Sequence, residues 1–189
     1  WESLENEVAC VAAFLRKNGV TKGDRVVAYL PNIPEAIIAF LATASIGAVW
    51  SSCSPDFGVG SVVDRFKQIE PKVIFTVNGY TYNGKPFDRS TEARDIVAAL
   101  PTLENVVLIP YLKNTDIQNI GFEHIIWENL LSDFSENTPP LSIGPVPFGH
   151  PLYILYSSGT TGIPKAITHC HGGILLEHLK YLAFHNDLK

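Results

Sequence analysis

The alternation of short apolar runs with helical patterns constrains this chain most. Runs rich in residues that favour β-strands occur at residues 25–30, 72–77 and 105–109, and apolar residues recur at helical spacing between them. Strands that alternate with helices need crossover connections, which favour a mainly parallel sheet with helices on both faces. The sequence therefore predicts an α/β fold, a layered and mainly parallel sheet flanked by helices.

The same alternation extends along the rest of the chain. A helical pattern at residues 1–18 ends at Gly19, which is typical of a helix C-terminal cap. A proline-rich run at residues 138–151 predicts an extended connector. The remaining predicted helices cover residues 34–46, 61–69, 91–100, about 124–131 and about 172–185, and the remaining predicted strands cover 48–50, 152–156 and 166–167.

The length and composition predict one core. Domains usually hold ~100–200 residues, so the 189 residues of this chain fit a single partial domain over residues 1–189. Trp50, Phe75 and Trp127 lie in apolar runs and are interpreted as core residues. The chain has no methionine and opens on Trp1 within a helical pattern, so we expect its natural start to lie upstream.

Charge and cysteine content exclude several classes of protein. The net charge of −5 argues against a general affinity for nucleic acid or for anionic membrane surfaces. The three cysteines lie far apart without CxxC spacing and predict neither a disulfide framework nor a zinc site. Without an apolar leader or a stretch of ~20 apolar residues, we expect a cytoplasmic protein. Nothing in the residues indicates a protein partner.

A segment rich in hydroxyls and glycine follows the predicted strand at 152–156. Residues 157–165, SSGTTGIPK, hold four hydroxyl side chains, two glycines and one lysine. Glycines let backbone N–H groups approach an anion, hydroxyls donate hydrogen bonds, and a lysine adds a mobile positive charge. This combination suits the phosphates of a nucleotide.

The segment is not a Walker A loop, because that motif places Gly-Lys-Ser/Thr directly before a helix. Here Ile163 and Pro164 separate Gly162 from Lys165. An ordinary surface loop at a strand end has a similar composition. From the residues alone, a phosphate-binding loop and a plain surface loop are equally good interpretations.

With Tyr156 included, the ten residues YSSGTTGIPK resemble, nearly letter for letter, the phosphate-loop signature of the adenylate-forming enzymes. That superfamily includes acyl-CoA synthetases, luciferases and the adenylation domains of peptide synthetases. Further segments resemble the N-terminal half of the large domain of the acyl-CoA synthetases that activate acetoacetate. These segments are GDRV at 23–26, LPN at 30–32, SIGAVWSS at 45–52, SPDFG at 54–58, DRF at 64–66, YNGK at 82–85 and GGILLEHLK at 172–180.

The resemblance implies an acid–thiol ligase that uses ATP, Mg²⁺ and CoA. Acetoacetate would attack ATP to give an acyl-adenylate, and CoA would then displace AMP to give acetoacetyl-CoA. The acyl pocket and the small C-terminal domain with its catalytic lysine would lie beyond Lys189, so we expect the piece alone not to complete the reaction. Contacts with the ATP phosphates are implied for Ser157, Ser158, Gly159, Thr160, Thr161, Gly162 and Lys165.

Three of these residues would act in the chemical step. Thr160 and Thr161 are implied as the main hydroxyl donors, and Lys165 would offset charge on the departing pyrophosphate. Donors placed where charge gathers lower the barrier, and removing one costs on the order of 3 kcal/mol in the transition state.

Residues 54–58 occupy the place where related acyl-CoA synthetases receive the nucleotide end of CoA. Phe57 and Gly58 are therefore candidate CoA-binding residues, although a tight turn with Phe57 packed inward fits the same pattern. Asp64 and Arg65 could reach the CoA phosphates, but a solvated helix face is the favoured interpretation.

His169 and His171 flank Cys170, yet no carboxylate or further cysteine stands at ligand spacing. We therefore predict polar packing for these histidines and no metal-binding side chains.

Two other functions remain open at this point. An acetyl- or propionyl-CoA synthetase would differ in its acyl pocket. A non-catalytic nucleotide-binding or scaffolding domain would lack the downstream catalytic lysine.

Overall fold

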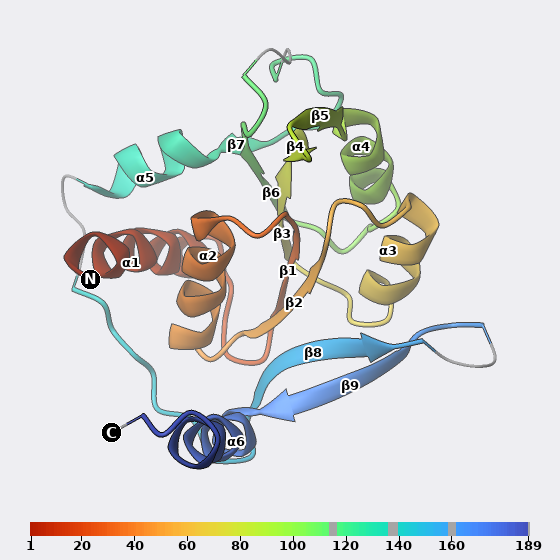
Figure 1. Cartoon of the computed structure of the whole chain (residues 1–189). Coiled ribbons are helices and arrows are strands. Elements are labelled where there is room, and N and C mark those ends of the chain that lie inside the picture. The colour runs from red at the N-terminus through yellow and green to blue at the C-terminus, as the bar shows by residue number, and fades with distance from the viewer. Residues whose placement is uncertain (114–116, 136–139, 159–161, 189) are drawn as a thin grey trace.

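A seven-stranded sheet forms the centre of the molecule (Figure 1). The computed structural model describes residues 1–113, 117–135, 140–158 and 162–188. Its helices are α1 (Glu2–Lys17), α2 (Pro34–Ser45), α3 (Val59–Phe66), α4 (Ser90–Ala98), α5 (Trp127–Ser135) and α6 (His171–Phe184). Its strands are β1 (Arg25–Tyr29), β2 (Val49–Cys53), β3 (Val73–Val77), β4 (Gly79–Tyr82), β5 (Lys85–Asp88), β6 (Asn105–Ile109), β7 (Ile125–Ile126), β8 (Pro151–Ser157) and β9 (Lys165–Cys170).

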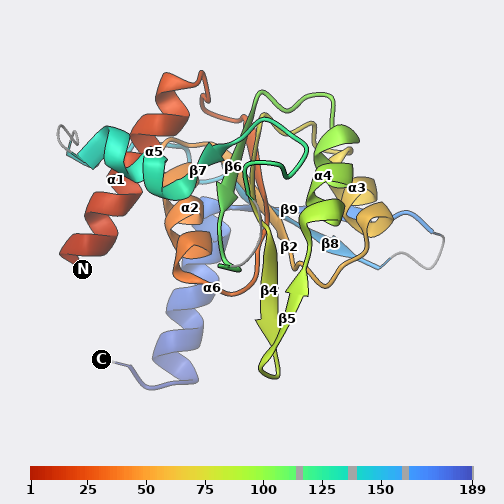
Figure 2. The ribbon, with the colours of Figure 1, turned by 90° about the horizontal axis from the view of Figure 1, so that it is seen from above.

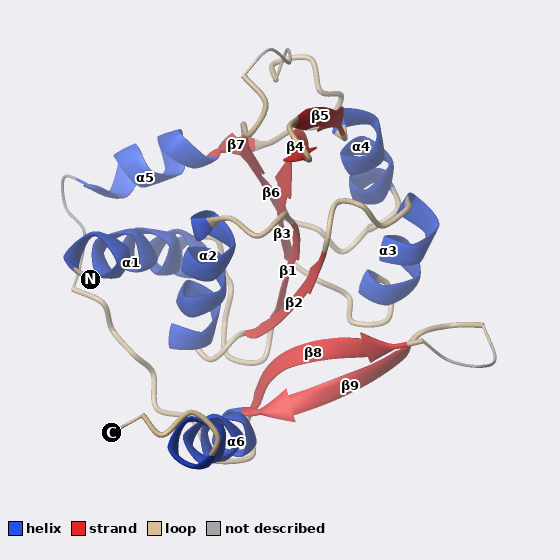
Figure 3. Ribbon diagram, viewed as in Figure 1, coloured by secondary structure: helices blue, strands red, loops and turns tan. Residues whose placement is uncertain are grey.

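The strands of the large sheet are ordered β7-β6-β3-β1-β2-β8-β9. All neighbours pair in parallel except β8 and β9, which form an antiparallel hairpin. Figure 3 shows the strands from β7 to β2 edge-on between the helices, with the hairpin of β8 and β9 below them. The expected layered, mainly parallel α/β fold is confirmed.

Successive residues of the central strand β1 enter two different cores. Val26 and Ala28 pack with α1, α2 and α5, whereas Val27 and Tyr29 pack with α3 and α4. Side chains alternate across a strand, so a strand buried on both faces reads as a continuous apolar run. Figures 1 and 2 show the two groups of helices on opposite faces of the sheet.

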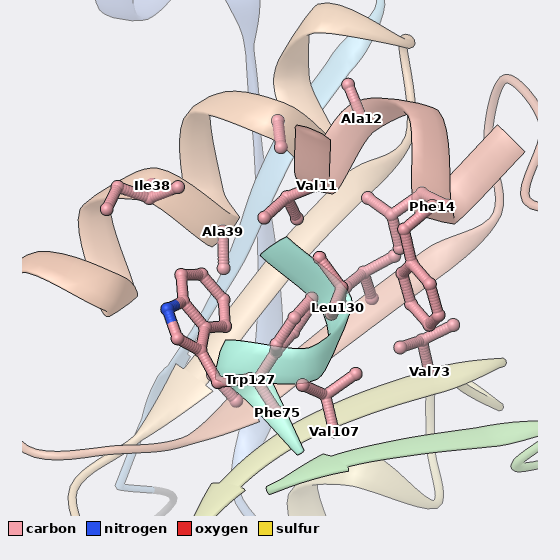
Figure 4. Packing of buried hydrophobic residues seen from close by; sticks show 14 of the residues in the cluster. Val11, Ala12, Phe14, Ile38, Ala39, Val73, Phe75, Val107, Trp127 and Leu130 are labelled. Carbon is pink, nitrogen blue, oxygen red and sulfur yellow. The ribbon is translucent and has the colours of Figure 1, made fainter. Parts of the chain in front are cut away.

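The three predicted core aromatics are buried in the larger core. Phe75 is fully buried, and its ring lies 6.5 Å from that of Trp50 and 6.1 Å from that of Trp127. Figure 4 shows Trp127 and Leu130 of α5 over Phe75 and Val107 of the sheet. The Phe75–Trp127 pair is edge-to-face, an arrangement that adds attraction to the burial of apolar surface. The interpretation of these residues as core is confirmed.

Gly19 ends α1 as predicted. Its φ of +74° lies in the left-handed region, which glycine adopts without a steric penalty. The amide of Gly19 donates to the carbonyl oxygen of Arg16, and that of Val20 donates to the carbonyl oxygen of Leu15. These two bonds form a Schellman motif, which satisfies carbonyl groups at the end of the helix.

Two elements were not predicted from the sequence. The hairpin β4–β5 turns at Asn83 and Gly84, which both have positive φ. Asn-Gly at the centre of a two-residue turn is a strong hairpin signal, so the sequence did carry this information. The two-residue strand β7 precedes α5 and is too short to recognise from a periodic pattern.

Within the described residues, no helix combines the length and the apolar character that crossing a bilayer requires.

Candidate functional site

The segment predicted to bind phosphate connects β8 to β9 at one edge of the sheet. We call residues 156–165 the phosphate loop. Ser157 pairs with Lys165 at the loop end of the hairpin, so these two residues flank the connection between β8 and β9. Gly159, Thr160 and Thr161 lie outside the described residues, and their predicted roles stay predictions.

The described part of the phosphate loop faces solvent. Ser157, Ser158, Gly162 and Lys165 are all exposed. Gly162 has a φ of +109°, a conformation that residues with a side chain rarely adopt. Lys165 forms no ion pair with any carboxylate of the described residues. Its ammonium group is therefore available to an anion.

Helix α3 and the turn after it contact both limbs of the phosphate loop. On the incoming limb, the Tyr156 hydroxyl donates to the carbonyl oxygen of Arg65 at 2.7 Å. On the outgoing limb, Gln68 Nε2 donates to the carbonyl oxygen of Pro164 at 2.9 Å. These bonds join segments about 90 residues apart in sequence and fix where the loop leaves the sheet.

Arg65 is packed between aromatic rings and is not simply a solvated residue. Its guanidinium carbon lies 5.1 Å from the centre of the Phe57 ring and 5.9 Å from that of Tyr156. The Nη1 atom also donates to the carbonyl oxygen of Ser61 at 2.6 Å and to the Ser61 hydroxyl. The expectation of a solvated face therefore holds for Asp64, which is exposed, and is wrong for Arg65.

The turn at residues 54–58 is held from below by the sheet. The amide of Phe57 donates to the carbonyl oxygen of Ser54, and the Tyr29 hydroxyl donates to those of Pro55 and Phe57 at 2.8 and 3.1 Å. Gly58 then caps the N-terminus of α3. The predicted tight turn is present, but Phe57 does not pack inward, because the residue is 39% exposed.

A cavity of about 740 Å³ lies beside this turn, over the carboxyl ends of the central strands. It is lined by residues that follow β1, β2 and β6, and by the hairpin β4–β5. Ligands of open α/β sheets bind at this edge, because the loops there diverge and leave a crevice. Arg89 supports the cavity wall by donating to the carbonyl oxygen of Pro55 at 2.9 Å.

Burial keeps two groups near the loop uncharged. It raises the pKa of Tyr156 to about 12, and the Cys53 thiol also works in that direction while Arg65 opposes both. Burial likewise raises the pKa of the Cys53 thiol to about 11. A tyrosine hydroxyl of ordinary pKa already keeps its proton at neutral pH, and burial keeps Tyr156 a hydrogen-bond donor at higher pH as well.

The two neighbouring histidines are packed against other rings. His169 lies 5.2 Å from the ring of Tyr153, and His171 lies 5.8 Å from that of His150. Within the described ranges, no group of three histidine, cysteine or acidic side chains could hold a metal ion.

Sequence reasoning missed the residues that support the loop. Tyr29, Gln68 and Arg89 donate hydrogen bonds to backbone carbonyl groups that lie 26 to 96 positions away. Arg65 contacts the rings of Phe57 and Tyr156. For Arg65 the sequence offered a contact with the CoA phosphates or a solvated helix face, and neither expectation places its side chain against Phe57 and Tyr156. No local pattern reports which distant carbonyl group a side chain will reach.

Comparisons with known proteins agree on one family. The model of the AMP-binding enzyme family matches residues 1–187. The chain is 48% identical over its full length to the acetoacetyl-CoA synthetase of Macaca fascicularis, of which it covers 28%. It is 46% identical to the acetoacetyl-coenzyme A synthetase of Rhizobium meliloti (strain 1021), of which it covers 29%.

A solved structure gives the same result. The acetoacetyl-CoA synthetase from Streptomyces lividans matches the whole chain with a TM-score of 0.90 and 50% sequence identity. The chain covers 28% of that structure. It thus spans less than a third of the length of the proteins to which it is similar.

Proposed function

The chain belongs to the AMP-binding enzyme family, and on that premise we propose that it is part of an enzyme that joins acetoacetate to CoA at the expense of ATP. One observation carries this proposal. Three acetoacetyl-CoA synthetases, from a mammal and two bacteria, align with the whole chain at 46–50% identity. Similarity at that level extends beyond the phosphate loop to every element of the fold.

The proposed reaction has two steps. A carboxylate oxygen of acetoacetate attacks the α-phosphorus of ATP. The bond between the α-phosphorus and the oxygen that bridges it to the β-phosphorus breaks, and pyrophosphate leaves. The thiol of CoA then attacks the acyl carbon of the adenylate. AMP leaves, the thiol proton is released, and acetoacetyl-CoA remains.

The phosphate loop would act on the first step. Negative charge gathers on the departing pyrophosphate, and hydroxyl, amide and ammonium groups already aimed at it lower the barrier. Ser157, Ser158 and Lys165, at the loop end of the hairpin, would supply such groups, and so would Thr160 and Thr161. Mg²⁺ would arrive with the ATP phosphates and shield their charge.

The turn at residues 54–58 would act on the second step. The partly exposed ring of Phe57 offers a face on which the adenine of CoA could stack, and Gly58 leaves room beside it. The adjoining cavity supplies a crevice for the rest of the nucleotide.

The test is acid-dependent pyrophosphate release by the full-length protein that contains this chain, with ATP and Mg²⁺. Acetoacetate is compared with acetate, propionate and 3-hydroxybutyrate. Lys165→Ala and Thr161→Ala are measured beside Lys113→Ala, which removes an exposed lysine after β6. Three strands lie between β6 and β8 in the sheet.

We expect release with acetoacetate, a loss of about 100-fold or more in the two loop variants, and little change in the control. Preference for acetate or propionate would replace acetoacetate as the substrate. No release with any of the acids would favour a non-catalytic nucleotide-binding domain.

A further inference from the structure

Arg65 contacts the two places to which the proposed function assigns different substrates. One is the ring of Phe57, beside the proposed CoA site, and the other is Tyr156, at the entrance to the phosphate loop. Nothing in the proposed reaction requires an arginine at this position.

Tyr156 is fixed to Arg65 at both ends of its side chain. Its ring carries the guanidinium, and its hydroxyl donates to the Arg65 backbone carbonyl oxygen at 2.7 Å. These two contacts leave the phenol little freedom to rotate. Since Ser157 and Ser158 follow directly in the chain, the position of Tyr156 determines where the backbone carries their hydroxyl groups.

Arg65 itself depends on few partners. In the part of the chain that the structure describes, no carboxylate forms an ion pair with it, and the hydrogen bonds of its side chain go only to Ser61, within the same helix. The contacts that reach beyond α3 are the two aromatic rings. A guanidinium held over aromatic rings is attracted by their electron-rich faces. The ring of Phe57 is therefore one of the two contacts beyond α3 that orient this side chain.

The backbone of the 54–58 turn cannot take over that role. It is held by the Tyr29 hydroxyl and by Arg89, which bind the carbonyl groups of Pro55 and Phe57. Loss of the Phe57 ring would leave the turn in place and would remove only the ring against which the Arg65 guanidinium packs.

We propose that Arg65 is a positioning residue for the phosphate loop and that the ring of Phe57 supports it, so that changes at Phe57 alter the use of ATP even when CoA is absent. This inference rests on the proposed function for its kinetic consequence. Its structural consequence, a loop loosened by distant substitutions, does not depend on that function.

The experiment measures ATP–pyrophosphate exchange with acetoacetate and without CoA, in the full-length protein. The variants are Arg65→Gln, Arg65→Lys, Phe57→Leu and Phe57→Tyr, with Arg94→Gln as the matched control. Arg94 is a half-exposed arginine on α4 that pairs with its neighbour Asp95. Hydrogen exchange of residues 156–158 and 163–165 is followed in the same proteins.

For Arg65→Gln we expect the KM for ATP to rise about three- to tenfold, the range that loss of a partly desolvated cation–π contact gives. Phe57→Leu should also raise the KM for ATP, and Arg65→Lys should raise it less than Arg65→Gln does. Phe57→Tyr keeps the aromatic ring, so its KM for ATP should be lower than that of Phe57→Leu and close to that of the wild type. The KM for acetoacetate should stay within about twofold, because a general loss of stability would not select one substrate. Arg65→Gln and Phe57→Leu should both speed the hydrogen exchange of the backbone amides at residues 156–158, but not of those in β1.

If the wild-type protein is active and the KM for ATP is unchanged in Arg65→Gln and Phe57→Leu, the inference is overturned. An equal rise in Arg94→Gln would also overturn it. If the wild type shows no exchange with any acid, the proposed function fails instead. Hydrogen exchange then decides on Arg65 alone, and unchanged protection of residues 156–158 would refute its role. Should Arg65→Gln fail to fold, Arg65→Lys and Phe57→Leu carry the test.

Discussion

The hydroxyl of Tyr156 donates a hydrogen bond of 2.7 Å to the backbone carbonyl oxygen of Arg65, a residue 91 positions earlier in the chain. The guanidinium of the same arginine lies 5.9 Å from the centre of the Tyr156 ring. The end of β8 is thereby attached to α3 by a polar contact and an aromatic contact at once.

Tyr156→Phe separates these two contacts, because it removes the hydroxyl and keeps the ring. We expect the free energy of unfolding to fall by about 1 kcal/mol, the usual net contribution of one hydrogen bond. Urea denaturation measures this loss. Tyr181→Phe, at a position 55% exposed on α6, is the control and should be neutral. Equal stability of both variants would contradict the structural role of the bond.

Gly162→Ala should impair the loop without unfolding the protein. The φ of +109° at Gly162 is costly for any residue with a side chain, by about 1–3 kcal/mol. Because the site is exposed, we expect the loop to rearrange locally and pyrophosphate release by the full-length enzyme to drop, with an unchanged melting temperature. Gly149→Ala, where a methyl group meets open space and φ is not positive, should leave both quantities unchanged.

Gly79→Ala should weaken the hairpin β4–β5. A methyl group at Gly79 would collide with the Phe87 backbone carbonyl oxygen and with Leu112, and a backbone atom cannot move aside cheaply. We expect a destabilisation of about 1–3 kcal/mol, as for overpacked cores. Gly60→Ala on α3 meets open space and should be neutral or slightly stabilising. A Gly79→Ala protein as stable as wild type would argue against close packing at the start of β4.

Acid should destabilise the protein through His171. Burial, and then the neighbouring His150, lower the pKa of His171, and its buried Nε2 has no hydrogen-bond partner among the described residues. The folded protein therefore binds this proton less readily than the unfolded chain. The stability contributed by neutral His171 is complete above the unfolded pKa of about 6.5 and is lost as the pH falls through the lower folded pKa.

His171→Leu should flatten this dependence, since leucine cannot be protonated. Denaturation midpoints between pH 7.5 and about 5 measure the effect, over the range in which an unperturbed histidine titrates. His185→Leu, at an exposed position after α6, is the control and should keep the wild-type slope. A slope that survives in His171→Leu would assign the acid sensitivity to other groups.

Residues 1–189 expressed alone should self-associate through α6. Leu175, Leu179 and Leu182 are 59%, 54% and 41% exposed, and their spacing places them on one face of the helix. Contiguous apolar surface of this kind favours association. Leu179→Glu should lower the apparent mass in analytical ultracentrifugation. Ile37→Glu, at a position 56% exposed on α2, should not. A monomer at all concentrations would contradict the expectation.

The sequence by itself determined the layers of the fold. Short apolar runs at positions such as 26–30 and 73–77 fit strands buried on both faces, and their alternation with stretches of helical spacing favours a parallel sheet covered by helices. It also singled out residues 157–165 as a candidate phosphate-binding segment, because they form one continuous string that resembles a known phosphate-loop signature. These are local signals, and local signals are read without knowing the fold.

Only the tertiary structure decided what holds that loop. The sequence gives no sign that Gln68 reaches Pro164, or that Arg65 lies between Phe57 and Tyr156. Such contacts depend on β8 pairing with β2, which brings the end of β8 beside α3. Chain segments far apart in sequence meet where the burial of apolar surface places them, and polar side chains then bind the nearest carbonyl group within reach.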